Sequence, residues 1–547
     1  MAEVAAGPTA KLGAAAVAVA AGILAFHLLL AGRTTLWDRD EPRFARAAVL
    51  MERSGQYLYP VFRDEVRTQK PILIYLLMTL SIRAIGVSEI SVRLWAPIGL
   101  TAAALATFLI GRRLISARAG LLAMTIVAFN PLALVEGTLA TTDAVLMAMM
   151  AAALAAFGWR LSSHARLGPW TIFAAACAGA FLVKGPVGVL PIVAAAGTLW
   201  SRRDRPDARR DAIYLALAAL AALAIFLLWW VPANAATGGR FFSEGVRHDI
   251  IGRVLAPLEG HGGNPLLWLP FYPIVVLLGF APWSAYIAAV CRQLRRGPAI
   301  ARGVRPLLTW WIACPLVAFS AAATHLPHYI LPIWPPLALA TAATIDSALE
   351  RGLDDATRRW ISRGLAVTVV TGLLACAAIV LASTLPSRDL LWRALPALAA
   401  VAGGAAAMIV CHLASRYRQA YAAALASVVA FESAIALVWV PAIDAFKPVP
   451  RLARTIHEAV PTGRPIATFR FDEPSLDFYL DATPRRFLDG ADLSQWAQAT
   501  GDGVVVTTRA AARALGPLPL REIGSASGYD IATGRPVELV AFARRQP

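Results

Sequence analysis

The sequence predicts an all-α polytopic membrane protein with about 13 spanning helices, followed by a small α/β domain. Of its 547 residues, 58% are hydrophobic, and the mean hydropathy is +0.60. A soluble protein of this size carries about 25% charged residues, whereas this chain carries 16%. The apolar residues also fall in blocks near the roughly 20 residues that a spanning helix needs.

The apolar blocks give the order of the spans. The block 170–200 is broken at "KGP", Lys184–Pro186, and predicts two short helices that meet there. The block 71–86 is short and contains Arg83, so it predicts a helix lying in the membrane interface. The remaining spans are expected near 12–32, 92–111, 119–135, 139–159, 212–232, 265–290, 307–323, 328–346, 361–384, 390–412 and 418–441.

Loop charge predicts which side each loop faces. Arginines cluster at 112–118, 160–166, 202–210, 292–305, 351–363 and 416–418, and such clusters mark cytoplasmic loops. The opposite, outer face, which is the periplasm in a bacterium, then receives 33–91, 136–142, the KGP break, 233–264, 324–327 and the C-terminal tail. In a membrane protein the formal charge of +17 does not indicate binding of nucleic acid.

The first apolar block and the cysteines give two further expectations. The run from Leu12 to about Ala31 follows Lys11 and could be a secretory signal, but its length favours an uncleaved first helix. The five cysteines lack metal-site spacing and read as small core residues.

The apolar blocks stop near Phe446. We therefore divide the chain into a transmembrane domain, 1–445, and a soluble periplasmic α/β domain, 446–547. "RPIATFRF", "GDGVVVTTRAAARAL" and "VELVAFARR" read as strands with intervening helices. No nucleotide-binding loop and no internal repeat occurs in the sequence.

Ionisable residues gather on the expected outer face. Such groups are expensive in a membrane and usually line a cavity. Some of these residues also have non-functional explanations. Asp40, Glu41 and Arg43 could form a solvated face of an interfacial helix, and Lys70 could extend its ammonium to the lipid headgroups. Asp143 could be an acid favoured by the helix dipole in a first turn. Lys184 is harder to dismiss, because it lies mid-block and needs a partner. The other candidates are His248, Arg253, Glu259, His261, His325, His328 and Tyr329.

A cavity with carboxylates and cations at its wall suits group transfer from a lipid phosphate. A carboxylate serves as general base or holds the acceptor, while Lys and Arg neutralise a leaving phosphate. Since the sequence has no ATP site, the donor is expected to arrive already activated in the membrane.

Four segments, in order, resemble the polyprenyl-phosphate-sugar-dependent glycosyltransferases of the GT-C type, and most closely their aminoarabinose (lipid A) transferase branch. "RDEPRFA" is similar to the first-loop signature DE-x-R-[YF]-A, and a Lys-Pro follows at Lys70. The other three are "VEGTLATTDAVLMAMM", "FLVKGPVGVLP" and "THLPHYILPIWPPLALA". The resemblance covers nearly the whole chain.

The resemblance implies an inverting transfer from an undecaprenyl-phosphate sugar, without a nucleotide, to lipid A or another lipopolysaccharide acceptor at the periplasmic face of the inner membrane. It implies that the catalytic acids are Asp40 and Asp143, with Glu41 beside them. The residues expected near the donor phosphate are Arg43, Lys70, Lys184, Arg253, His325 and Tyr329.

Two positions depart from the family pattern. His325 stands where the family's late motif usually has Lys, which weakens the phosphate contact or makes it depend on pH. Gln69 stands where the aminoarabinose enzymes usually carry Glu, so a divalent metal is not required. Metal or acceptor contacts are left open at His248, His261, His328 and Gln69. The sugar stays open between a uronic acid, a hexose and an aminosugar.

Other classes of function remain as alternatives. A related enzyme similar to the protein O-mannosyltransferases would use a protein acceptor. A lipid-linked sugar transporter would carry charges near mid-membrane in pseudo-symmetric halves, whereas here they gather at one face. A purely structural protein would leave Lys184 and Asp143 unexplained.

The predicted sidedness is tested by cysteine labelling from outside intact cells. Cysteines introduced at position 40 and in the turn just before position 143 are both expected to react with an impermeant thiol reagent, because both places are assigned to the outer face. Labelling of the two positions from opposite faces of the membrane would rule out a shared cavity.

Overall fold

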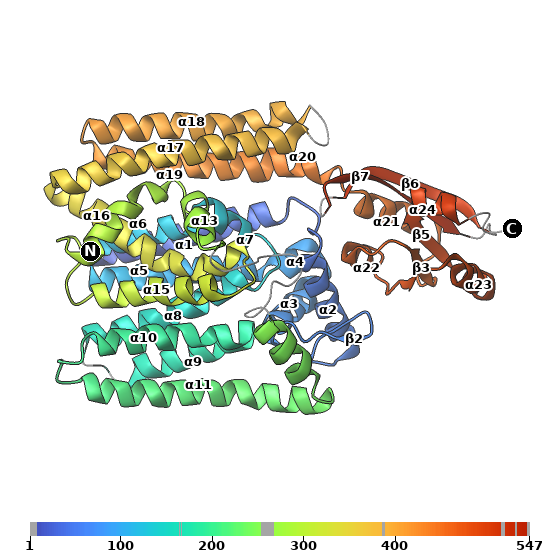
Figure 1. The fold of residues 1–547 in the computed structure, drawn as a ribbon, viewed down its shortest axis with the longest axis horizontal. Helices are drawn as coiled ribbons and strands as arrows, with labels where there is room; N and C mark the ends of the chain where they lie inside the picture. Colours follow the sequence, from blue (N-terminus) through green and yellow to red (C-terminus); the bar gives the residue numbers. More distant parts are fainter. Residues whose placement is uncertain are drawn as a thin grey trace, which may run out of the picture.

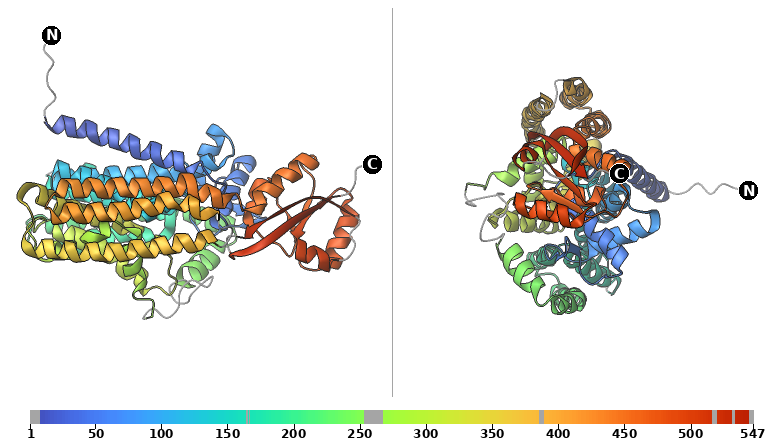
Figure 2. Two further views of the ribbon diagram at one scale, coloured as in Figure 1. Left: turned by 90° about the horizontal axis from the view of Figure 1, so that it is seen from above. Right: turned by 90° about the vertical axis from the view of Figure 1, so that its right-hand side faces the viewer.

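The computed structural model describes residues 8–163, 165, 167–252, 267–384, 389–515, 520–530 and 533–543. A bundle of nearly parallel helices carries a small sheet domain at one end (Figure 1). Figure 2 shows that the helices follow the long axis and that the C-terminal sheet extends beyond the bundle. This confirms a mostly helical polytopic membrane protein with a small C-terminal mixed sheet.

The bundle follows the predicted apolar blocks. Its α-helices are α1 (Pro8–Ala31), α5 (Trp95–Leu114), α6 (Ala117–Ala128), α7 (Pro131–Glu136), α8 (Asp143–Ser162), α9 (Leu167–Lys184), α10 (Leu190–Trp200), α11 (Ala208–Ala236), α13 (Phe271–Gly279), α14 (Ile287–Arg295), α15 (Arg305–Ala321), α16 (Trp334–Arg351), α17 (Asp355–Thr384), α18 (Leu390–Leu413), α19 (Tyr417–Ala434) and α20 (Val440–Asp444). Shorter 3-10 or π segments are η1 (Gly185–Val189), η2 (Phe241–Gly252), η3 (Trp283–Tyr286), η4 (Pro327–Ile333) and η5 (Ile435–Trp439).

Fewer helices than expected have the length and composition of a span. Within the described residues, eight helical stretches qualify, or nine if the bent pair α13 and α14 counts as one span. The expected spans at 119–135, 307–323 and 328–346 correspond to α6, α15 and α16, which do not qualify. The central position of α16 explains one of these differences, because a helix surrounded by protein needs no lipid-facing apolar surface.

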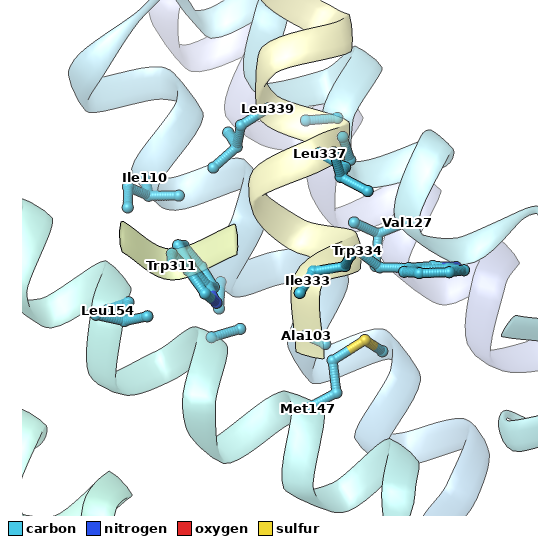
Figure 3. Close-up of a cluster of buried hydrophobic side chains, with 14 of the residues drawn as sticks. Ala103, Ile110, Val127, Met147, Leu154, Trp311, Ile333, Trp334, Leu337 and Leu339 are labelled. Atoms are coloured by element: carbon cyan, nitrogen blue, oxygen red, sulfur yellow. The ribbon is translucent and has the colours of Figure 1, made fainter. Parts of the chain in front are cut away.

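The core packs around α16. Trp334, Leu337 and Leu339 of this helix lie among side chains of α5, α6 and α8 (Figure 3). The indole nitrogen of Trp334 donates a hydrogen bond to the side-chain oxygen of Asn130 at 2.6 Å. The small residues Ala and Thr of α16 allow close approach of neighbouring helices.

The chain reverses at the KGP break, as the sequence predicts. Gly185 has φ +57°, which glycine adopts without strain. A side chain added at Gly188 would lie 2.6 Å from the backbone nitrogen of Phe181, seven residues earlier, so the chain must fold back on α9. Lys184, the last residue of α9, therefore sits at the turn between α9 and α10 (Figure 1).

The first loop forms a compact layer at the sheet end of the bundle. It contains α2 (Asp40–Ser54), the hairpin β1 (Val61–Phe62) and β2 (Glu65–Val66), α3 (Leu73–Ile85) and α4 (Glu89–Arg93). Phe44 of α2 packs against Tyr75 of α3, with ring centroids 5.5 Å apart. The expected interfacial segment 71–86 is thus a short helix, α3.

The C-terminal part is a five-stranded mixed sheet in the order β4-β3-β5-β7-β6. β3, β4 and β5 are parallel, and β7 pairs antiparallel with β5 and β6. The strands are β3 (Ile466–Phe469), β4 (Arg485–Phe487), β5 (Val504–Thr508), β6 (Arg521–Asp530) and β7 (Arg535–Ala543), and the helices are α21 (Pro448–Ala459), α22 (Pro474–Tyr479), α23 (Gly490–Thr500) and α24 (Arg509–Ala514). The three predicted strand segments became β3, β5 and β7.

Candidate functional site

A polar cavity of about 330 Å³ opens at the end of the bundle that carries the sheet. Its wall combines the first loop, the start of α8, the KGP turn and η4 with two residues of the C-terminal sheet domain. The lining residues are Asp40, Arg43, Phe44, Phe62, Arg63, Glu65, Arg67, Gln69, Lys70, Thr141, Thr142, Asp143, Lys184, Leu326, His328, Tyr329, Asp472 and Arg486. Residues that lie far apart along the chain therefore line one cavity.

An ion pair between Lys184 and Asp143 forms the floor of this cavity. The side chains of Lys184 and Asp143 are 8% and 5% exposed, so their charges are shielded from water. The ammonium nitrogen of Lys184 also lies 4.6 Å from the centroid of the Tyr329 ring, a distance that favours a cation–π contact. Asp143 is therefore the partner that a buried lysine within an apolar block requires.

Two carboxyl groups flank His328 beside the floor. The Nε2 atom of His328 lies 4.0 Å from Asp143, and its Nδ1 atom lies 3.9 Å from Glu136 at the end of α7. Glu136 is buried and accepts a hydrogen bond from the hydroxyl of Thr141 at 2.8 Å. Glu136 was not among the expected site residues, although an acid directly after an apolar run is a visible signal in the sequence.

Asp40 begins α2 and lines the cavity as an exposed side chain. Arg43, three residues later in α2, lines the cavity as well. Gln69 and Lys70 line it from the segment before α3. Three further cations of the lining, Arg63, Arg67 and Arg486, were not predicted. Arg67 donates to the hydroxyl of Tyr75 at 2.7 Å, so its guanidinium is held against the cavity wall.

Glu41 does not line the cavity, which argues against the catalytic role expected from the sequence. It is 2% exposed and forms two hydrogen bonds with the guanidinium of Arg93, at 2.8 and 2.7 Å. It also accepts hydrogen bonds from the backbone nitrogens of Trp37 at 2.8 Å and Ala140 at 2.5 Å. With both oxygens occupied, Glu41 is suited to holding the first loop against the turn that precedes Asp143.

His325 also lies away from the cavity. It is 2% exposed and packs among the rings of Trp268, Phe271 and Tyr272. Leu326, not His325, reaches the cavity wall. The expected contact between His325 and the donor phosphate therefore has no support in this geometry, because aromatic side chains enclose the imidazole.

The remaining candidates lie in or near a segment that is not described. His248 belongs to η2, but its side chain is not among the described ones. Arg253, Glu259 and His261 lie outside the described residues. Across the described part of the chain, no group of three or more His, Cys, Asp or Glu side chains could hold a metal ion.

An apolar groove of about 560 Å³ joins the polar cavity. Trp229, Trp230, Phe241 and Phe319 line it, together with residues of η1 and α10. Gln69, Lys70, Lys184 and Tyr329 line both spaces. The structure thus offers a polar cavity that meets an apolar groove, with cations where the two meet, which fits an amphipathic ligand with an anionic head.

The comparisons agree with the resemblance found in the sequence. Residues 69–230 match the model of the dolichyl-phosphate-mannose-protein mannosyltransferase family. The chain is 30% identical over 362 residues to the undecaprenyl phosphate-alpha-4-amino-4-deoxy-L-arabinose arabinosyl transferase of Pseudomonas aeruginosa, and 29% identical over 344 residues to that of Shewanella sediminis. The first match covers 64% of this chain and 63% of the relative.

The fold is also shared. The crystal structure of ArnT from Cupriavidus metallidurans bound to undecaprenyl phosphate aligns with a TM-score of 0.75 and 20% identity, covering 96% of this chain and 97% of that one. The chain is thus similar in sequence to about two thirds of the length of these transferases, and it shares the fold of ArnT from Cupriavidus metallidurans.

Proposed function

We propose that this protein is an inverting glycosyltransferase. It moves a sugar from an undecaprenyl-phosphate-linked donor to a lipid A or lipopolysaccharide acceptor at the periplasmic face of the bacterial inner membrane. The observation that carries the proposal is the junction of the charged cavity with the apolar groove. A polyprenyl-phosphate sugar has a matching polarity, because its chain is apolar, its phosphate is anionic and its sugar is polar.

In this proposal the donor phosphate sits at the junction, near Lys70, Lys184 and Tyr329, and Arg43 lies on the cavity side. The polyprenyl chain follows the groove along Trp229 and Phe241, and the sugar enters the polar cavity. Lys184 is fixed by Asp143, so its charge is already oriented when the phosphate arrives. A cation held in this way stabilises the charge that develops on the leaving phosphate.

The reaction breaks the bond between the anomeric carbon and the phosphate oxygen and forms a bond from that carbon to the acceptor oxygen. Polyprenyl phosphate leaves with the electron pair of the broken bond. Where the acceptor is a hydroxyl group, its proton passes to the carboxylate of Asp40, the general base. Asp143 is better suited to holding Lys184, because that ion pair already occupies it. No step needs a nucleotide, and none is routed through a metal.

A protein acceptor is the runner-up, since the matched family model is named for protein mannosyltransferases. The division into a transmembrane domain, 1–445, and a periplasmic domain, 446–547, belongs to the same proposal. So does the crossing of the membrane by about 13 helical segments, with α6, α15 and α16 among them.

The substitution Asp40→Asn tests the catalytic assignment. It is expected to reduce sugar transfer at least 100-fold, because loss of a positioned general base typically costs a factor of about 10² to 10⁴. The measurement follows radiolabelled sugar from undecaprenyl-phosphate donor to lipid A with purified protein in detergent. Asp355→Asn, an exposed acid at the start of α17, is the matched control and should transfer at the wild-type rate.

Transfer by Asp40→Asn at the wild-type rate would refute the base assignment. If the radiolabelled sugar appeared on a protein in total membranes and on no lipid, the acceptor would be a protein and the lipid acceptor would be ruled out. Absence of transfer to any membrane component by the wild-type protein would refute the proposed activity.

Glu136→Gln tests the electrostatics behind the site. Burial and the neighbouring Asp143 raise the pKa of Glu136 from 4.5 to about 8. Between these values the folded protein keeps a proton that the unfolded chain has lost, so the free energy of unfolding falls as pH rises, by up to about 1.4 kcal/mol per pH unit. In the Glu136→Gln variant this pH-dependent fall in the free energy of unfolding is absent, because glutamine does not titrate. Its melting temperature relative to wild type should rise from pH 5 to pH 8 and then level off; a pH-independent difference would contradict the assignment.

A further inference from the structure

The outer wall of the cavity comes from the C-terminal sheet domain. Asp472, just after β3, and Arg486, in β4, both line the cavity and form an ion pair at 3.2 Å. Asp472 also accepts a hydrogen bond from Arg63, at the tip of the β1–β2 hairpin. A domain more than 400 residues away in the sequence from this hairpin therefore completes the polar compartment.

The C-terminal domain is held firmly enough to place these side chains. The hydroxyl of Tyr479 accepts a hydrogen bond from the backbone nitrogen of Leu36 at 2.7 Å. Arg46 and Arg53 both donate to Asp481 at 2.6 Å. These contacts fix α22 against the first loop, and β4 follows α22 directly.

Two of the ion pairs at this wall, Arg63–Asp477 and Arg486–Asp472, differ in their exposure. Arg63 pairs with Asp477 through two hydrogen bonds, at 2.8 and 2.7 Å, and the two side chains are 11% and 1% exposed. The side chains of Asp472 and Arg486 are 56% and 47% exposed. An exposed pair contributes about 0–1 kcal/mol. An incoming anion can therefore replace Asp472 at Arg486 with little loss, while Arg63 keeps its own buried partner.

The position of this wall separates it from the donor site. Gln69, Lys70, Lys184 and Tyr329 are the residues shared with the apolar groove, whereas Arg63, Asp472 and Arg486 line the polar cavity alone. If the donor phosphate occupies the junction, Arg486 faces the side from which the acceptor enters.

We propose that Arg486 is a specificity-determining residue that binds an anionic group of the acceptor, a phosphate or a carboxylate, in place of the internal carboxylate of Asp472. The C-terminal domain thereby takes part in acceptor selection. This inference rests on the proposed glycosyltransferase function, since it assigns the two ends of the cavity to donor and acceptor. A guanidinium suits this task because it forms paired, charge-assisted hydrogen bonds with such anions.

Binding measurements with the full-length protein in nanodiscs test the proposal. Saturating undecaprenyl phosphate first fills the donor site, and the probe is fluorescent lipid A, before and after enzymatic removal of its phosphates. Arg486→Gln is expected to weaken binding of phosphorylated lipid A about tenfold, which corresponds to the loss of one charged contact of about 1.4 kcal/mol. Binding of the dephosphorylated probe should be equally weak in variant and wild type.

Two variants complete the experiment. Arg485→Gln removes the neighbouring arginine of the same strand, which is exposed and does not line the cavity, and it should bind phosphorylated lipid A as wild type does. Asp472→Asn removes the competing carboxylate and should tighten that binding. Equal losses in Arg485→Gln and Arg486→Gln, or no preference of the wild type for the phosphorylated probe, would overturn the inference. Sugar transfer by the wild type is measured separately, so failure of the inference and failure of the proposed activity are distinguishable.

Discussion

The buried ion pair between Glu41 and Arg93 is the constraint on which the geometry of the site depends. Both side chains are almost completely buried, at 2% and 1% exposure. Burying two charges is costly unless their geometry is good and their remaining hydrogen-bonding groups are satisfied. Arg93 meets this condition by donating to the backbone carbonyls of Ala31, Thr34 and Thr35, where α1 ends. Glu41 meets it through Trp37 and Ala140.

This network joins the two acidic motifs. Glu41 is adjacent to Asp40, and Ala140 lies three residues before Asp143. The pair therefore fixes the end of the first helix, the start of α2 and the turn before α8 relative to one another. From this arrangement, Asp143 reaches Lys184 at the KGP turn, and the cavity obtains its charged floor. The ionisable groups that line the cavity thus come together at the end of the bundle that carries the sheet.

The sequence was informative for charged residues in apolar surroundings, because burying such a charge without a partner costs free energy. Lys184 in an apolar block needed a partner, and Asp143 is that partner. Asp40, Arg43, Lys70, His328 and Tyr329 were placed on one face by loop charge, and the cavity brings them together. These assignments depended on the free-energy cost of placing a charge in a membrane. The position of a charged residue relative to the apolar blocks is visible in the sequence alone.

Other expectations depended on packing, which the sequence does not show. Glu41 belongs to the first-loop motif and His325 replaces the lysine of the late motif, but burial is a property of packing, and neither side chain lines the cavity. Arg63 and Arg486 could not be linked from the sequence, because the contact of the β1–β2 hairpin with the sheet domain spans more than 400 positions. The helix α16 lacks the apolar surface of a span because other helices surround it.

A double-mutant cycle on Glu41 and Arg93 tests the central claim most directly. The free energy of unfolding is measured in detergent for Glu41→Gln, Arg93→Gln and the combined variant. Each single change should lower it by about 3–5 kcal/mol, because the partner is left as an unpaired buried charge. The combined variant should lose much less than the sum of the two. Strictly additive losses would show that the two residues do not act as one interaction, and would contradict the account.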